Sequence, residues 1–286
     1  MCSNRVYIVS LLVLFYSCAF AERHDIHAEA DRPGMGTGTN ILDRGCVQWE
    51  TGIEVAHLTN THCLTLPTVL FRFGLSEWAE LRLEYTGLLA INAQPYTNNT
   101  KPKVQYMPEP LWVGSKMRLW KGSEQTSLRW VPRTSLLLNL GVPLTKLDAQ
   151  NRPICGSIGL LFENDITDWL TIGYDLGIDW IDWAPTPDVF ASLAFNFMPT
   201  EKFGIFIESY NIFDPDAVRA DAPTRTYTIY DINLDFGITY MVHPHVQLDA
   251  NAGFNLYHSE SYLSSPKSYS FFGIGVTWLL HQTISK

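Results

Sequence analysis

Hydrophobic and polar residues alternate with a period of two through most of this chain, which is the pattern of β-strands. In the stretch FGLSEWAELRLEY, Leu81 and Leu83 would point to one side of an extended strand. Arg82 and Glu84 would then point to the other side. In a soluble sheet the apolar side faces a protein core, whereas in an outer-membrane barrel it faces lipid and the charged side faces a polar interior. The alternation predicts strands and leaves open which side meets water.

Hairpins of the same form recur along the chain, each joining two alternating strands through a tight polar turn. Further examples are ENDITDWLTIGYDLGIDW (163–180), FNFMPTEKFGIFIESY (195–210) and GITYMVHPHVQLDANAGFNLY (237–257). Longer connections rich in Pro, Asn, Asp, Ser or Thr separate the hairpins and show no helical periodicity, at residues 90–110, 145–153, 182–188, 211–226 and 258–267. Short turns alternating with long loops are typical of bacterial outer-membrane barrels, with the turns periplasmic and the loops extracellular.

The pattern predicts about twelve strands, an even number as a single-chain bacterial barrel requires. We expect them near residues 46–57, 64–74, 80–89, 111–120, 133–143, 156–164, 170–180, 189–198, 203–210, 228–241, 246–257 and 269–280. Several have roughly the 9 to 11 residues that a tilted strand needs to cross a bilayer. The connection at 121–132 is longer than a periplasmic turn should be, and the pattern does not explain it.

A soluble β-sandwich could show the same alternation, but three further features favour a membrane barrel. The N-terminus has the form of an export signal. The final strand, SYSFFGIGVTWLL, has alternating aromatic residues, as the last strands of outer-membrane barrels do, although residues 281–286 follow it. Aromatic residues also gather at strand ends and turns, as in an interfacial girdle: Trp78, Trp112, Trp120, Trp169, Trp180, Trp183, Tyr240 and Tyr257. We therefore predict an all-β protein, a transmembrane antiparallel up-and-down β-barrel.

Residues 1–21 are predicted to be a signal peptide. Arg5 supplies a positive charge, an apolar stretch follows, and the small-x-small sequence Ala19-Phe20-Ala21 marks a cleavage site. A lipoprotein modified at Cys18 is the alternative, but the bulky residues before that cysteine do not suit a lipobox. The expected organisation is a signal peptide (1–21), a periplasmic N-terminal segment (22–44) and an outer-membrane barrel (45–286).

Composition narrows the possible classes of protein. Of the 286 residues 46% are hydrophobic and 17% charged, yet after the N-terminus no apolar run reaches the ~18 to 20 residues of a membrane-spanning helix. The formal charge of −9 argues against nucleic-acid binding, which needs a basic surface. The cysteines are widely spaced and predict no zinc site, and we expect no metal ion or other cofactor. The expected partners are outer-membrane lipids, the barrel-assembly machinery and a small-molecule solute.

The stretch EADRPGMGTGTNILDRGCVQWETGIE, residues 29–54, closely resembles one family. Its Asp-Arg-Pro-Gly sequence, Gly/Thr-rich spacer and first strand are similar to those of the outer-membrane transporter family named for the MetA pathway of phenol degradation. FGLSEWAELRLEY is similar to a second landmark of that family. The resemblance implies a β-barrel in the outer membrane of a Gram-negative bacterium. It implies an aromatic solute only through the pathway context that gave the family its name.

The strand faces that would line the barrel interior carry charges of opposite sign in the two halves of the chain. Basic residues fall on early strands: Arg72, Arg82, Lys116 and Arg118. Most acidic residues fall on late strands: Asp175, Asp179, Glu208, Asp231, Asp235 and Asp249. The predicted lumen-lining set also includes Gln48, Glu50 and Glu84. Strands half a barrel apart face each other, so the cations would oppose the anions across the lumen.

Two interpretations of these charges remain open. They could form salt bridges across a narrow interior and stabilise a plugged barrel, because a partly buried charge needs a partner. They could instead line a water-filled pore and bias it towards cations or polar solutes, as charged rings do in channels. A barrel of about twelve strands is compatible with either, since it lies between filled eight-stranded barrels and open porins.

The N-terminal stretch DRPGMGTGTN would enter the barrel from the periplasmic side. Its glycines allow a close approach to a wall, and Arg32 could pair with an acidic residue of the lumen. Asp31, Arg32 and Pro33 are therefore candidates for a partial plug of the periplasmic mouth. A disordered leader is the alternative.

The favoured function is the passive passage of small solutes, including aromatic or hydrophobic ones, across the outer membrane. The alternatives are a non-conducting barrel with structural or adhesive loops and a barrel enzyme that modifies lipids. Such an enzyme needs a base beside its nucleophile, and one candidate is His258, which borders a loop near Ser259 and Ser261. No GxGxxG, P-loop or HExxH motif is present, and we predict no enzymatic activity.

Overall fold

The computed structural model describes residues 27–58, 61–92, 103–122, 128–144, 155–180, 187–218, 226–259 and 269–281. The predicted signal peptide, the predicted girdle residue Trp183 and the loop residue Ser261 lie outside the described residues. Within the described part, no helix is long and apolar enough to cross a membrane.

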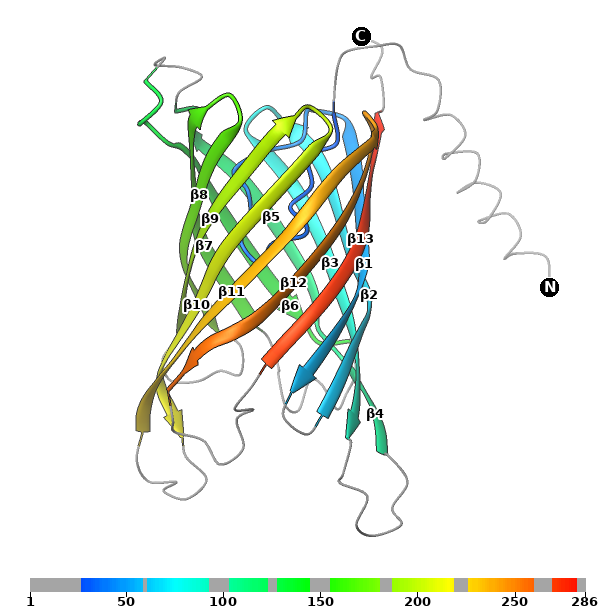
Figure 1. Ribbon diagram of the computed structural model, residues 1–286, viewed down its shortest axis with the longest axis vertical. Helices are drawn as coiled ribbons and strands as arrows, with labels where there is room; N and C mark the ends of the chain where they lie inside the picture. Colours follow the sequence, from blue (N-terminus) through cyan, green and yellow to red (C-terminus); the bar gives the residue numbers. More distant parts are fainter. Residues whose placement is uncertain are drawn as a thin grey trace, which may run out of the picture.

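The regular elements of the described chain are β-strands, which wind around a common axis (Figure 1). They are β1 (Cys46–Leu58), β2 (Thr61–Ser76), β3 (Ala79–Asn92), β4 (Lys103–Pro108), β5 (Leu111–Trp120), β6 (Arg133–Val142), β7 (Cys155–Thr167), β8 (Leu170–Trp180), β9 (Asp188–Thr200), β10 (Phe203–Val218), β11 (Thr226–His243), β12 (Val246–His258) and β13 (Tyr269–His281). Nearly all pair antiparallel with their neighbours in sequence. β1 also pairs with β13 along its length, from Cys46 opposite His281 to Leu58 opposite Tyr269, and this pairing closes the barrel.

Strands β4 and β5 together form one interrupted strand of the wall. β5 pairs with the first half of β3, and β4 pairs with its second half, from Gly87 opposite Pro108 to Asn92 opposite Lys103. Pro108 ends β4 and Pro110 directly precedes β5, because proline has no N–H to donate to a ladder. The wall therefore consists of twelve antiparallel strands, and the predicted fold class and strand number are confirmed.

The sequence underestimated how far some hairpins extend at the loop end. β4 lies within the stretch 90–110, and β10 continues to Val218 within the stretch 211–226, both of which were expected to be polar connections. β10 and β11 remain paired as far as Val218 opposite Thr226, with a bulge after Asp214. Turn-forming residues such as Pro215 made this part of the sequence look irregular, whereas the bulge accommodates the interruption without ending the pairing.

The two faces of the wall differ as an outer-membrane barrel requires. Leu81 is 36% exposed on the outside, whereas Arg82 is 5% exposed because it points into the barrel. Ile274 on β13 is likewise 50% exposed, and Gln48 on β1 is fully buried. Apolar side chains thus cover the outer face and would contact acyl chains, while polar and charged side chains face the interior. This answers the question that the alternating pattern left open.

The two ends of the barrel also differ. At the upper end in Figure 1 lie the short turns after β2, β7, β9 and β11, together with the start of β1 and the end of β13. Trp78 and Trp169 are exposed in two of these turns, as expected for an interfacial girdle. Most of the longer connections lie at the opposite end. We call the upper end the turn end and the lower end the loop end, and they correspond to the periplasmic and extracellular sides.

Candidate functional site

The N-terminal segment, residues 27–45, runs inside the barrel (dark blue trace in Figure 1). Its backbone exchanges hydrogen bonds with inward-facing side chains of one strand after another. In chain order these partners are Glu50 on β1, Asn251 on β12, Glu208 on β10, Asp175 on β8, Ser135 on β6 and Glu80 on β3. The strands β1, β12, β10, β8, β6 and β3 follow one another around the barrel in this order. The segment therefore follows the inner wall around most of the circumference.

Asp31 lies at the centre of a buried cluster of cations. Its carboxylate accepts hydrogen bonds from Lys116 Nζ at 2.9 and 3.0 Å and from Arg82, and it lies 3.6 Å from Arg72 Nη1. Burial alone would raise the pKa of Asp31, but the three neighbouring cations hold this pKa well below its ordinary value. The carboxylate is therefore ionised and binds the segment to the wall formed by β2, β3 and β5.

Glu80 on β3 completes this cluster and was missed by the sequence analysis. Arg72 makes a bidentate contact with it, with Nε and Nη2 each 2.9 Å from a carboxylate oxygen, and Arg82 Nη1 lies 3.0 Å away. The backbone N–H of Leu42 also donates to Glu80, at 3.0 Å. Glu80 lies two residues before Arg82 on β3, so the period of two places both side chains on the inner face. The position of Glu80 close to a turn obscured this.

Arg32 binds the segment to the seam at which the barrel closes. Its guanidinium donates to Thr68 Oγ1 at 3.1 Å and lies 3.5 Å from Asp249 Oδ1. A Cβ atom added to Gly275 would lie 2.6 Å from Arg32 Nε, so only glycine leaves room for the guanidinium at this place on β13. The predicted pairing of Arg32 with an acidic residue of the lumen thus has a defined partner in Asp249.

The glycines of the segment allow its backbone to contact the opposite wall. The N–H groups of Met35 and Gly36 donate to the two oxygens of Glu208 at 2.9 and 2.7 Å. A Cβ atom at Gly36 would lie 2.5 Å from Glu208 Oε1 and 2.7 Å from Ser192 Oγ. Successive backbone N–H groups around a carboxylate form an anion-binding nest, and a side chain at Gly36 would prevent it.

Further along, the segment contacts β5, β6 and β7. Lys116 Nζ donates to Gly38 O at 2.8 Å, and Ser135 Oγ donates to Thr39 O at the same distance. The Thr39 hydroxyl donates to Glu163, which also lies 3.1 Å from Arg133 Nη2. Glu163 is a second inward-facing acid that the sequence analysis did not include.

The predicted lumen-lining residues divide into two groups. Those that contact the segment are Gln48, Glu50, Arg72, Arg82, Lys116, Asp175, Glu208 and Asp249. For Glu84, Arg118, Asp179, Asp231 and Asp235, no contact with the segment is seen within the described ranges. Asp231 instead pairs with His258. The buried cations pair with Asp31 and with neighbouring acids of the early strands. In the part of the chain that the structure describes, they do not form the pairs with late-strand acids across the lumen that the first of the two interpretations required.

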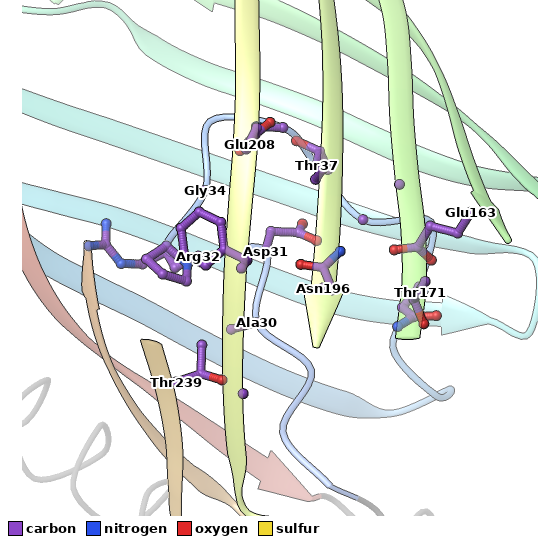
Figure 2. A pocket seen from close by; sticks show the side chains of 18 of the residues that line it. Ala30, Asp31, Arg32, Gly34, Thr37, Glu163, Thr171, Asn196, Glu208 and Thr239 are labelled. Carbon is purple, nitrogen blue, oxygen red and sulfur yellow. The ribbon is translucent and has the colours of Figure 1, made fainter. Parts of the chain in front are cut away.

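Two cavities lie on opposite sides of the stretch 34–37. The inner vestibule, about 320 Å³, opens towards the turn end and is bordered by the segment, Glu163, Thr171, Asn196, Glu208 and Thr239 (Figure 2). The outer vestibule, about 250 Å³, lies towards the loop end, and Met35 forms part of its lining. Late-strand acids line both: Asp175 and Glu208 the inner one, Asp231 and Asp235 the outer one.

Comparison with known proteins identifies relatives of this barrel. The sequence model of the family described as "Putative MetA-pathway of phenol degradation" matches residues 30–280, a range that includes most of the internal segment. An outer-membrane channel from Pseudomonas putida F1 is 10% identical and superposes with a TM-score of 0.61, over 87% of this chain and 99% of that one. The porin NanC is 9% identical, with a TM-score of 0.52 over 80% of this chain and 98% of that one.

A search of the curated proteins finds no match to the chain. At these levels of identity the two solved structures establish a shared fold. Together with the apolar outer face of the wall, that fold assigns the chain to the outer membrane of a Gram-negative bacterium.

Proposed function

The chain belongs to the family of the MetA pathway of phenol degradation, and we propose that it is a passive outer-membrane channel for small solutes. Residues 27–45 narrow the bore of this channel as a partial plug, with Asp31 and Arg32 as its anchors. The fold shared with an outer-membrane channel and a porin supports this proposal, as do the polar interior and the vestibules on both sides of the segment.

The division of charges inside the barrel is the observation that carries the proposal. The cations of β2, β3 and β5 are occupied by Asp31 and by neighbouring carboxylates. The late strands carry acids that line the two vestibules, namely Asp175, Glu208, Asp231 and Asp235. Asp175 and Glu208 also accept backbone N–H groups of the segment, and Asp231 pairs with His258. We infer that the buried cations of β2, β3 and β5 are the main anchor of the segment and that solutes pass along the acidic side chains of the late strands, β8 to β12. Rows of carboxylates favour cations and polar solutes over anions.

In this proposal the charges have two roles, one in each part of the wall, although the salt bridges around Asp31 do not cross the lumen. The buried pairs around Asp31 hold the segment in place, since a buried charge without a partner is costly. The acids around the vestibules contribute to solute selection. The proposal leaves the chemical identity of the solute open, and the aromatic or hydrophobic solute suggested by the family name is one candidate to be tested.

Liposome swelling tests the proposal directly. Purified full-length protein is refolded into liposomes, which are then diluted into isotonic solutions of uncharged solutes of increasing size and of small aromatic solutes. We expect swelling rates that fall steeply with solute size, because the segment leaves only a narrow passage. Swelling no faster than in protein-free liposomes for every solute would contradict the channel and favour the non-conducting alternative.

A lipid-modifying enzyme is not favoured by any contact among the described residues. The Nδ1 atom of His258 pairs with Asp231, and its Nε2 atom is buried without a hydrogen-bond partner among the described residues, so it does not hold a serine hydroxyl there. Nucleophilic catalysis needs a base in contact with the nucleophile. Phospholipase and deacylase assays on the refolded protein would detect such an activity if the loop residues outside the described ranges supplied it.

A further inference from the structure

The outer vestibule contains a carboxylate that lacks a partner. Asp235 on β11 is 2% exposed, and neither of its carboxylate oxygens has a hydrogen-bond partner on another of the described residues. Its neighbour in register, Glu208 on β10, receives two N–H groups from the segment. Asp249 is held by Arg32. Asp235 thus differs from the other inward-facing acids nearby, and its side chain lines the outer vestibule.

No cation of the described chain is in position to pair with Asp235. Arg32 is engaged by Asp249 and Thr68, and the remaining buried cations lie around Asp31 on the far wall. The charged groups that act on Asp235 are themselves acidic, namely Glu208 and Glu54. A buried carboxylate in such surroundings is costly unless a cation or several donors approach it. A positively charged ligand would supply the partner that the described chain does not provide.

Aromatic rings surround the same space. Tyr210, Tyr269 and Phe271 line the vestibule together with Asp235, and the rings of Tyr269 and Phe271 lie 5.6 Å apart. Phe271 is positioned by Gly253, opposite it on β12, because a Cβ atom at Gly253 would lie 2.6 Å from Phe271 Cζ and 2.8 Å from Asp235 Cβ. The glycine therefore brings a ring next to the unpaired carboxylate.

A carboxylate beside aromatic rings is the chemistry that recognises organic ammonium ions. The charge is neutralised by the carboxylate, and the carbon atoms bonded to nitrogen contact the ring faces through cation–π interactions. A divalent metal fits less well, since it needs several oxygen ligands, and no group of three or more metal-ligating side chains occurs in the described chain. The volume of about 250 Å³ is just below the ~300 Å³ at which typical ligand pockets begin, so the ligand is small.

We propose that the outer vestibule is a binding site for a small organic ammonium ion with an apolar or aromatic body, anchored by Asp235. The inference rests on the proposed function in one respect: in a channel, this site would collect such solutes on the extracellular side before they cross. The binding of the ligand does not itself depend on transport. Asn233 and Asn255, which are hydrogen-bonded to each other at 2.9 Å, supply polar groups towards the mouth of the site.

The test is isothermal titration calorimetry on the refolded full-length protein in a nonionic detergent at neutral pH. The ligands are benzylammonium chloride, benzyl alcohol and sodium benzoate, which differ mainly in charge. We expect benzylammonium to bind at least about tenfold more tightly than either analogue, a difference of about 1.4 kcal/mol. Equal heats for benzylammonium and benzyl alcohol would mean unspecific partitioning and would overturn the proposal.

Variants locate the site. Asp235→Asn removes the charge at constant size and should weaken benzylammonium binding at least about tenfold, while Asp235→Glu should retain most of it. The matched control is Asp168→Asn, in a turn at the opposite end, where the side chain is 91% exposed. Undiminished binding by Asp235→Asn would show that the carboxyl is merely hydrated or protonated. Heat-modifiable gel migration verifies that each variant is folded.

Bilayer conductance measured on the same preparation separates this inference from the proposed function. Binding without conductance would contradict the channel and leave the site intact. Conductance without charge-selective binding would overturn the site and leave the channel intact.

Discussion

Gly52 and Gly275 lie opposite each other in register across the seam between β1 and β13, and the guanidinium of Arg32 lies against both. This contact joins the N-terminal segment to the first and last strands of the barrel. The segment is thereby bound to the place where the sheet closes, in addition to its contacts with the cations around Asp31.

Gly275→Ala should displace Arg32 and loosen the segment. The new methyl group would meet only the ends of side chains, with Arg32 Nε at 2.6 Å and Asp249 Oδ1 at 2.8 Å, so these can move while the strand stays in place. Overpacking of this kind costs about 1 to 3 kcal/mol. We expect higher single-channel conductance in planar bilayers. Gly156→Ala is the control, because its nearest neighbour would be a carbonyl oxygen at 3.8 Å. Equal conductance of both variants would contradict the role of Arg32.

Arg32→Ala should have the same direction of effect for a complementary reason. It removes the ion pair with Asp249 and the hydrogen bond to Thr68. Hydrogen bonds to charged groups contribute about 1.5 kcal/mol or more, so the fraction of time that the segment is detached should rise about tenfold. Longer or more frequent high-conductance openings should appear. Arg129→Ala, which removes an exposed pair with Asp168 at the turn end, should leave the openings unchanged.

Asp31→Asn should detach the segment more strongly. Arg72, Arg82 and Lys116 would lose a shared counter-charge in a buried site, and breaking such a cluster costs about 3 kcal/mol. Amide hydrogen exchange in the segment should then accelerate by about a hundredfold. The control is Asp43→Asn, which is exposed near the end of the same segment. Unchanged protection of the segment in Asp31→Asn would show that the charge cluster does not hold it.

The contribution of Asp31 should also depend on pH in a defined direction. Its pKa is lower in the folded protein than the ordinary value of 3.8, because three cations favour the ionised form. The stabilisation is therefore complete above that ordinary value and is lost as the pH falls towards the depressed one. The protection factors of the segment's amides, which correct for the intrinsic pH dependence of exchange, should stay constant from neutral pH down to about 5 and fall in stronger acid. Asp31→Asn should lack the part of this acid-induced loss of protection that the carboxyl contributes.

The wall was predictable because its determinant is local. A period of two assigns Leu81 and Arg82 to opposite faces whatever their partners are, and the low exposure of Arg82 agrees with that assignment. The tight turns were predictable for the same reason, since their polar residues occur between alternating runs. The strand extensions in β4 and β10 were not, because pairing with β3 and β11 there outweighs the local turn propensity of prolines.

The charge pairs were harder to predict than the wall. The contact between Asp31 and Lys116 depends on the path of the segment through the lumen, which no periodicity encodes. Opposite charges on early and late strands suggested pairing across the lumen. The segment instead brings Asp31 close to Arg72, Arg82 and Lys116. Glu80 shows a different difficulty, because a residue at the start of a strand has too few neighbours of known orientation to reveal its face.

Neutralising an acid of the late wall should reduce the preference of the channel for cations. Asp179 on β8 has the same parity as Asp175 and faces inward, without a contact to the segment among the described residues. Asp179→Asn should therefore leave the segment in place and alter only the potential along the pathway. The measurement is the reversal potential across a planar bilayer in a potassium chloride gradient, which should be of cation-selective sign in the unmodified protein and move towards zero in the variant. Asp168→Asn, exposed outside the bore, should show the unmodified value. A reversal potential that responds equally to both variants would mean that surface charge, and not the acidic wall, determines selectivity.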